Sequence, residues 1–107
     1  MVRRIILSPG ARADIEEAAR WYRRKETHLY QRFKAEVHST LLRIAQHPYS
    51  FVRQNGAFRR ACTNRFPYYI YFRFNADAVF VRTVTHQRRS DAIWKDRMDE
   101  SPEMRDD

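Results

Sequence analysis

The side chains best suited to chemistry in this sequence are arginines, tyrosines and one histidine in its C-terminal half. The stretch RFPYYIYFRF (65–74) surrounds one proline with aromatic, apolar and arginine residues, and THQRR (85–89) follows soon after. Histidine has an ordinary pKa close to neutrality and can serve as an acid or a base, and arginine stabilises negative charge on a phosphate. Together these residue types could form an acid–base site, and if the chain is a nuclease the candidate catalytic residues are Tyr71, Arg73, His86 and Arg88.

The same side chains also fit a surface that binds a partner without catalysis. Exposed tyrosines beside arginines can stack on single-stranded bases, which makes Tyr69 and Tyr71 candidates for such a platform. A lone histidine at a strand end, such as His86, is more often a hydrogen-bonded structural residue than a catalyst. The candidate partner-binding residues are Arg59, Arg60, Tyr69, Tyr71, Arg73, Arg82, Arg88 and Arg89.

The remaining residues do not show the patterns of a metal or cofactor site. His28, His38 and His47 are spread along one predicted helix and its ends, without the spacing of metal ligands. Cys62 is the only cysteine, so an internal disulfide and a thiolate metal centre are excluded, and we expect its thiol to be buried. We therefore predict no metal and no cofactor.

The chain is strongly basic, with 21 lysines and arginines against 13 acidic residues and a formal net charge of +8. The stretch DESPEMRDD (99–107) holds five of the acids, so residues 1–98 carry +12. This charge favours an anionic partner, either nucleic acid or an acidic protein. The length allows one domain, placed at 1–98, followed by an acidic disordered tail at 99–107. No apolar run is long enough for a signal peptide or a membrane span, so we expect a cytoplasmic protein.

Two predicted helices precede the arginine- and tyrosine-rich stretches. Ser8 and Pro9 are typical of a helix start, the first helix should end near Lys25, and Thr27 is expected to cap a second helix that Pro48 closes. With so short a connection, the helices must form an antiparallel hairpin. Their apolar residues recur at helical spacing: Ala11, Ile15, Ala18, Ala19 and Tyr22, then Leu29, Phe33, Val37, Leu41 and Ile44. Trp21 is expected in the core.

The hairpin needs a sheet on which to bury these residues. Strand formers predict an N-terminal strand at 2–7 and a meander of strands at 58–63, 67–74 and 78–86, with Asn75-Ala76-Asp77 as the last turn and 49–57 as a loop. In the middle strand, Tyr68, Ile70, Phe72 and Phe74 share one face and should pack under the helices. The alternation of residues in 78–86 does not show which of its two faces points inward. Ser90-Asp91 predicts a short final helix that Trp94 anchors.

Several local phrases of the chain, in the right order, resemble toxins of the ParE/RelE superfamily, including the ParE-like plasmid stabilisation proteins. The resemblance spans about residues 2–94 and is carried by LSPGARADIEEAARWY, LYQRFKAEVHSTLLRIAQHP, Arg59-Arg60, FPYYIYFRF and VRTVTHQRRSDAIW. It implies an α+β fold in which a two-helix hairpin packs on a small, mostly antiparallel four-stranded sheet, with a short C-terminal helix.

The resemblance implies two different activities. RelE-type relatives cut mRNA in the ribosome with basic side chains, whereas ParE-type relatives poison DNA gyrase by a protein contact. Tyr69 stands where the nucleases keep a strand arginine and Gln87 stands near their late arginine, so both catalytic charges are missing. A strand-ending histidine followed by arginines, here HQRR (86–89), is common among ParE-like members.

The interpretation favoured by the resemblance is a type II toxin that inhibits gyrase without catalysis. The alternative is a ribosome-dependent mRNA endonuclease, whose target would be the ribosome with its mRNA. Either activity implies a cognate acidic antitoxin, ParD-like or related, that folds along the helical hairpin and the basic sheet.

Overall fold

A computed structural model of the chain describes residues 2–89, without the side chain of Asn55. The predicted final helix with Trp94 and the predicted tail at 99–107 lie outside the described residues. The elements in chain order are β1 (Arg4–Leu7), α1 (Pro9–Lys25), α2 (Thr27–Gln46), the 3₁₀ turn η1 (Pro48–Ser50), β2 (Val52–Asn55), β3 (Phe58–Cys62), β4 (Tyr68–Phe74), β5 (Ala78–His86) and the 3₁₀ turn η2 (Gln87–Arg89).

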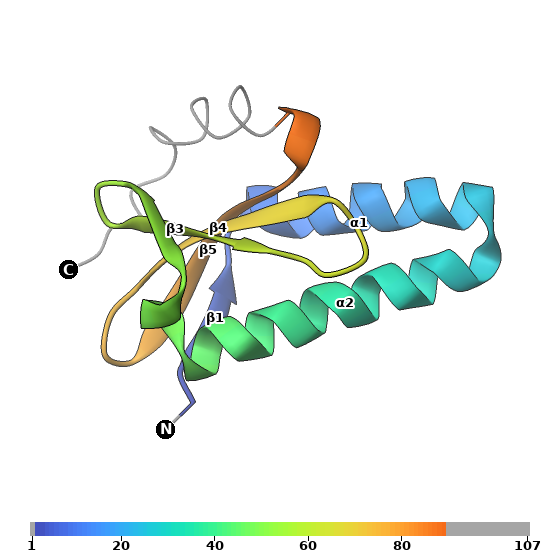
Figure 1. The fold of residues 1–107 in the computed structure, drawn as a ribbon. Helices are drawn as coiled ribbons and strands as arrows, with labels where there is room; N and C mark the ends of the chain where they lie inside the picture. Colours follow the sequence, from blue (N-terminus) through green and yellow to red (C-terminus); the bar gives the residue numbers. More distant parts are fainter. Residues whose placement is uncertain (1, 90–107) are drawn as a thin grey trace.

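The two helices form the predicted antiparallel hairpin and lie side by side against one face of the sheet (Figure 1). Ser8 caps α1, because its side chain accepts a hydrogen bond from the N–H of Ala11, and α1 ends at Lys25 as expected. The prediction of Thr27 as a cap is wrong: Thr27 is already helical, and Glu26 is the single residue between the helices. One extended residue therefore reverses the chain.

The sheet has five strands in the order β1-β5-β4-β3-β2, one more than predicted. β1 pairs with β5 in parallel, and the other neighbours are antiparallel. The additional strand is β2, which lies in the segment predicted as a loop. Its sequence VRQN contains a single strand former, Val52. It pairs with β3 at the edge of the sheet. Gly56, in the turn between the two strands, has a φ of +57°, which favours glycine.

A β-bulge in β5 settles which of its residues face the helices. Tyr71 lies opposite Thr83 and Phe72 lies opposite Val81, so Arg82 is an extra residue in β5. Val79 and Val81 belong to the core before the bulge and Val84 belongs to it afterwards. Strict alternation from Val81 would have directed Val84 away, which is why the sequence pattern alone was undecided.

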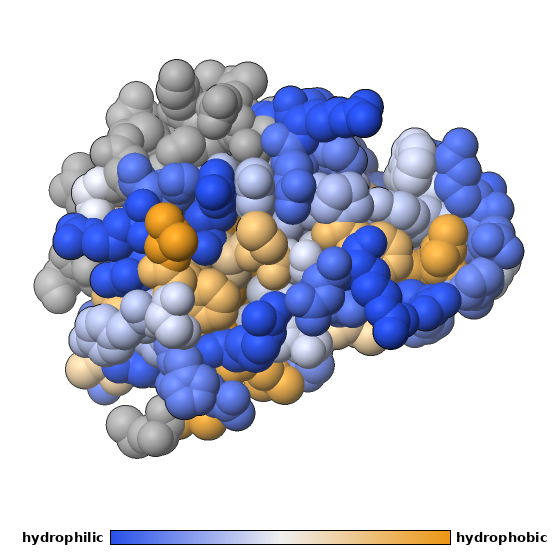
Figure 2. All heavy atoms as spheres, viewed as in Figure 1, coloured by the Kyte–Doolittle hydropathy of each residue, from blue (hydrophilic) through white to orange (hydrophobic). Residues whose placement is uncertain are grey.

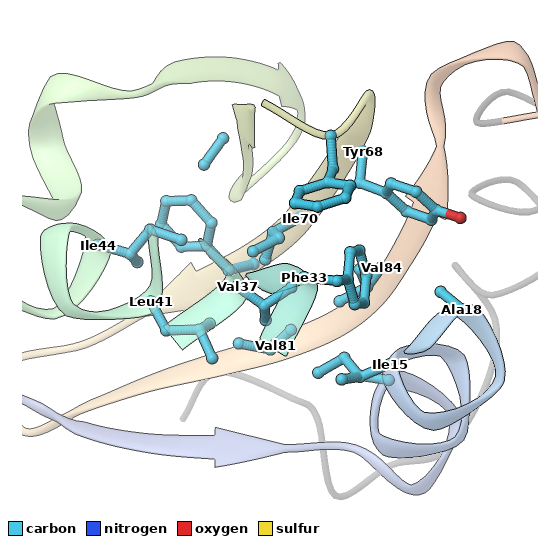
Figure 3. Close-up of a cluster of buried hydrophobic side chains, with 14 of the residues drawn as sticks. Ile15, Ala18, Phe33, Val37, Leu41, Ile44, Tyr68, Ile70, Val81 and Val84 are labelled. Atoms are coloured by element: carbon cyan, nitrogen blue, oxygen red, sulfur yellow. The ribbon is translucent and has the colours of Figure 1, made fainter. Parts of the chain in front are cut away.

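The core lies between the helical hairpin and the sheet, where residues from α1 and α2 meet β4 and β5 (Figure 3). The predicted inward residues of β4 are buried at Tyr68, Ile70 and Phe72 and half-buried at Phe74. The prediction of Trp21 as a core residue is wrong, since it is 46% exposed. Its neighbour Tyr22 packs inward instead, because consecutive residues of a helix point about 100° apart.

The face shown in Figure 2 carries many hydrophilic residues around several apolar patches. His28, His38 and His47 are exposed. Within residues 2–89, no group of three potential metal ligands comes together. Neither of the described helices α1 and α2 is long and apolar enough to cross a membrane.

The start of α1 is fixed directly to β5. Ser8 donates its N–H to the carbonyl of Val81 at 3.0 Å and its hydroxyl to the carbonyl of Arg82 at 2.9 Å. One and a half turns later, the Asp14 carboxylate accepts hydrogen bonds from the N–H of Val84 at 3.0 Å and the hydroxyl of Thr83 at 2.9 Å. Because β1 pairs no further than Val81, this carboxylate takes the place of a neighbouring strand.

Replacing Asp14 should therefore destabilise the whole domain. We expect Asp14→Ala to lower the free energy of unfolding by about 1–3 kcal/mol, because two donors on β5 lose their acceptor. Asp14→Asn retains one acceptor oxygen and should recover part of the loss. Urea unfolding followed by circular dichroism measures both, with the exposed Glu17→Ala on the next turn as control. Equal stability of Asp14→Ala and Glu17→Ala would contradict this role.

Candidate functional site

A groove of about 650 Å³ lies between α1 and the C-terminal end of β5. The residues lining it come from α1, β4, β5 and η2, and they are Asp14, Glu17, Ala18, Trp21, Tyr22, Arg24, Tyr68, Val84, Thr85, His86, Arg88 and Arg89. Its three arginines outnumber the two acidic residues, Asp14 and Glu17, and Trp21 is exposed, so the groove is mildly basic and partly aromatic. This combination suits a partner that carries acidic and apolar side chains.

Helical spacing and the bulge of β5 place these side chains together. Asp14, Ala18 and Tyr22 follow one another at intervals of four residues along α1, and Trp21 lies three residues after Ala18, so all four border the groove from neighbouring positions on the helix. His86 lies opposite Tyr68 in the sheet, and the two rings meet edge to face at 5.3 Å. The groove therefore joins residues separated by about sixty positions in sequence.

η2 holds the last described arginines at the rim of the groove. The N–H of Gln87 donates to the carbonyl of Pro67 at 2.9 Å, and the N–H of Arg88 donates to Nδ1 of His86 at 3.1 Å. Because Nδ1 is an acceptor here, a neutral His86 carries its proton on Nε2. His86 thus shapes the turn that presents Arg88.

Tyr22 and Tyr68 form the floor of the groove. Their rings meet at an angle, with centroids 6.3 Å apart. Burial raises the pKa of Tyr68 to about 12, with a further rise from Tyr22, and burial also raises the pKa of Tyr22. Figure 3 shows the Tyr68 hydroxyl directed away from the aliphatic core. Both phenols therefore stay neutral at physiological pH, and their hydroxyls are available to form hydrogen bonds with a partner in the groove.

The other predicted binding residues lie on the sheet, and two of them are not accessible. Tyr71 is 1% exposed and Arg82 is 2% exposed, so neither can contact a partner in this conformation. The prediction failed for them because alternation gives the face of a side chain without saying what covers that face. Tyr69 is half-buried under Arg60, whose guanidinium lies 4.1 Å from its ring centroid. Cys62, expected to be buried, is exposed on β3 opposite Tyr69.

Arg59 and Arg73 are also half-buried, and each lies against an aromatic ring. The Arg73 guanidinium is 5.1 Å from the ring centroid of Phe58. The Arg59 guanidinium is 5.6 Å from that of Phe74. Of the eight predicted binding residues, the groove therefore contains only Arg88 and Arg89.

The four candidate catalytic residues are not brought to one place. His86 lies opposite Tyr68 at one end of β4, whereas Arg73 lies opposite Phe80 near the other end. Five residues of strand separate these positions, roughly 16 Å at about 3.3 Å per residue. Proton transfer requires a donor and an acceptor within hydrogen-bond reach, and Tyr71, the candidate for proton transfer beside His86, is 1% exposed. The four residues therefore do not form one acid–base site in this structure.

Sequence reasoning missed the α1 wall of the groove. Tyr22 was predicted as a core residue only, and Arg24 was not singled out. The available signal was Trp21 beside Tyr22: two large aromatic residues in succession cannot both face the core, because adjacent positions of a helix diverge. One of them had to be exposed near the edge of the sheet.

The comparisons with known proteins agree with this fold. The family model described as "ParE toxin of type II toxin-antitoxin system, parDE" matches residues 5–91, so the chain belongs to the ParE toxin family. Proteins of this class are toxins that function with an antitoxin partner. None of the curated proteins matches the sequence.

A solved structure titled "Chromosomal ParDE TA system from P. aeruginosa" is similar in fold, with a TM-score of 0.68 and 11% sequence identity. The similarity covers 79% of this chain and 96% of that one. The predicted class, an α+β fold with a helical hairpin on a small sheet, is confirmed.

The buried tyrosine pair predicts a distinct pH dependence. Burial raises the pKa of Tyr68 above the unfolded value of about 10, so stability should hold below pH 10 and decline as pH rises through about 12. NMR of ¹³Cζ-labelled tyrosine should show one resonance titrating near pH 12. Tyr68→Phe should remove that resonance, whereas Tyr69→Phe should not. A Tyr68 resonance that titrates near 10 would contradict the assigned environment.

Proposed function

We propose that this ParE-family toxin arrests growth by binding and poisoning DNA gyrase rather than by cutting RNA. The observation that carries this proposal is the dispersal of the basic and titratable residues. His86 and Arg73 lie at opposite ends of β4, and Tyr71 is buried. Stabilising a phosphorane takes preorganised positive charge at one point, and loss of a single such group typically costs about 10²–10³ in rate. A protein contact has no such requirement.

The partner of the toxin is proposed to be an acidic, ParD-like antitoxin that occupies the groove between α1 and β5. Arg24, Arg88 and Arg89 supply positive charge there, and Trp21 supplies exposed aromatic surface, the combination found at the centre of tight interfaces. Residues 1–98 carry a net charge of +12, which would speed association with an acidic chain. Both the antitoxin and gyrase act in the cytoplasm, where we place the toxin.

Charge reversal in the groove should weaken antitoxin binding. We expect the double variant Arg88→Glu/Arg89→Glu to bind the co-expressed antitoxin at least about tenfold more weakly, with a larger loss at low salt than at high salt, because exposed charges are screened. Isothermal titration calorimetry at two salt concentrations measures this. The matched control is Arg43→Glu/Arg53→Glu, which makes the same charge change at exposed positions outside the groove. Equal weakening by both pairs would place the antitoxin elsewhere.

The proposed target is tested by assaying both activities with one preparation. Purified toxin should inhibit DNA supercoiling by gyrase, and its induction in bacteria should cause filamentation and DNA-damage signalling. Translating ribosomes given the same toxin should show no new mRNA cuts. His86→Ala should reduce toxicity no further than its loss of stability explains. Codon-positioned mRNA cleavage that disappears in a folded His86→Ala or Tyr71→Phe variant would instead establish the endonuclease.

A further inference from the structure

An exposed tyrosine lies beside two arginines at the end of β4 that is farther from the groove. Tyr49, on η1, is 72% exposed, the highest value among the large apolar and aromatic residues that are exposed in the described part of the chain. The Tyr49 ring contacts Phe74, the last residue of β4. The two ring centroids are 4.8 Å apart and the ring planes are nearly perpendicular. The ring is therefore held in place while most of its surface faces solvent.

Two guanidiniums lie beside this ring. The Arg3 Cζ atom is 6.0 Å from the Tyr49 centroid, and the Arg59 Cζ atom is 5.9 Å from it. Both distances are at the outer limit of cation–π contact, about 6 Å, and Tyr49 remains 72% exposed, so the two cations leave most of the ring accessible. Each guanidinium is closer to Phe74, at 5.4 and 5.6 Å respectively.

Backbone carbonyls fix both arginines. Arg3 donates its Nε–H to the carbonyl of Asn75 at 2.8 Å, and Arg59 donates from Nη1 to the carbonyl of Phe51 at 2.8 Å. Each guanidinium has five N–H donors, so these bonds leave several for an anion. Of the two ion pairs found within residues 2–89, neither involves Arg3 or Arg59. Among residues 2–89, no carboxylate forms an ion pair with either of these two oriented cations.

The contact with Phe74 holds η1 against the sheet, but any apolar side chain at position 49 could make that contact. A tyrosine that is 72% exposed adds little to stability and offers a flat aromatic surface. Two cations about 6 Å from the centre of an exposed ring fit the alternation of phosphate and base in a nucleic acid strand. An acidic peptide would use the cations and leave the ring without a partner.

We propose that Arg3, Tyr49 and Arg59 form a binding site for single-stranded nucleic acid, in which a base stacks on Tyr49 and the flanking phosphates contact the two guanidiniums. Stacking on an aromatic side chain is typically worth about 1–3 kcal/mol per base and is tolerant of sequence. The site is separate from the groove, since Tyr68 and Phe74 are six residues apart along β4, roughly 20 Å. It is a binding activity additional to gyrase poisoning and does not depend on it.

Fluorescence anisotropy with a labelled oligothymidylate and a labelled oligouridylate tests the site on the full chain. Tyr49→Ala should weaken binding of both probes by at least about fivefold, the lower bound of the stacking contribution, whereas Tyr49→Phe should bind like the wild type. Tyr30→Ala is the control: Arg23 and Lys34 lie 5.6 and 5.2 Å from the Tyr30 ring centroid, but this ring is half-buried and packs against the core, unlike the exposed ring of Tyr49. It should leave the affinity unchanged.

The arginines have a separate measurement. Arg3→Gln/Arg59→Gln should reduce the slope of log K against log salt by roughly 1.4, about 0.7 for each lost phosphate contact on a single strand. Melting temperatures identify variants that fail to fold, and Tyr49→Ala changes no backbone hydrogen bond.

Three results would overturn the proposal. The first is equal affinity of Tyr49→Ala and wild type. The second is a loss of binding in Arg88→Glu/Arg89→Glu alone, which would place the strand in the groove. The third is displacement of the oligonucleotide by an acidic peptide at equal charge, with no sensitivity to Tyr49, which would identify an acidic protein as the ligand.

Discussion

The attachment of the first turns of α1 to β5 is the constraint on which the rest of the molecule depends. β1 is only four residues long, and it leads directly into α1 through Ser8, whose hydrogen bonds to Val81 and Arg82 fix the start of the helix on the sheet. Asp14 extends this attachment beyond the end of β1. The two walls of the groove are therefore held at a fixed separation by polar bonds, while apolar packing fills the space beneath.

The extra residue in β5 has an equally large effect on the groove. If β5 alternated regularly after Val81, Val84 and His86 would face away from the helices. The bulge at Arg82 shifts the phase, which brings Val84 into the core and places His86 against Tyr68 on the α1 side. A one-residue irregularity thus determines which side chains form the site. Bulges are frequently found where a side chain must be redirected in this way.

Much of the fold could be predicted because its signals are local. The Ser8-Pro9 start, the apolar spacing of both helices and the Asn75 turn each depend on a few neighbouring residues, and all three were identified correctly. β2 was missed because its pairing comes from its position beside β3 rather than from its composition. The site was harder to predict, since Tyr22 meets Tyr68 only through tertiary packing, and the burial of Tyr71 and Arg82 depends on what covers them.

The distribution of charge favours binding over catalysis for a physical reason. A catalyst must hold its groups in contact with one reacting centre and in a precise orientation, whereas the backbone positions paired with His86 and Arg73 lie about 16 Å apart along β4. A binding surface sums contributions from separate places, and its affinity tolerates wide spacing provided that each contact is made. Arg88 and Arg89 lie near one end of β4 and Arg3 and Arg59 near the other, so the two proposed contacts use separate sets of cations. A chain of this size can present both because the helical hairpin covers one face of the sheet and leaves the two ends of β4 to carry the cations.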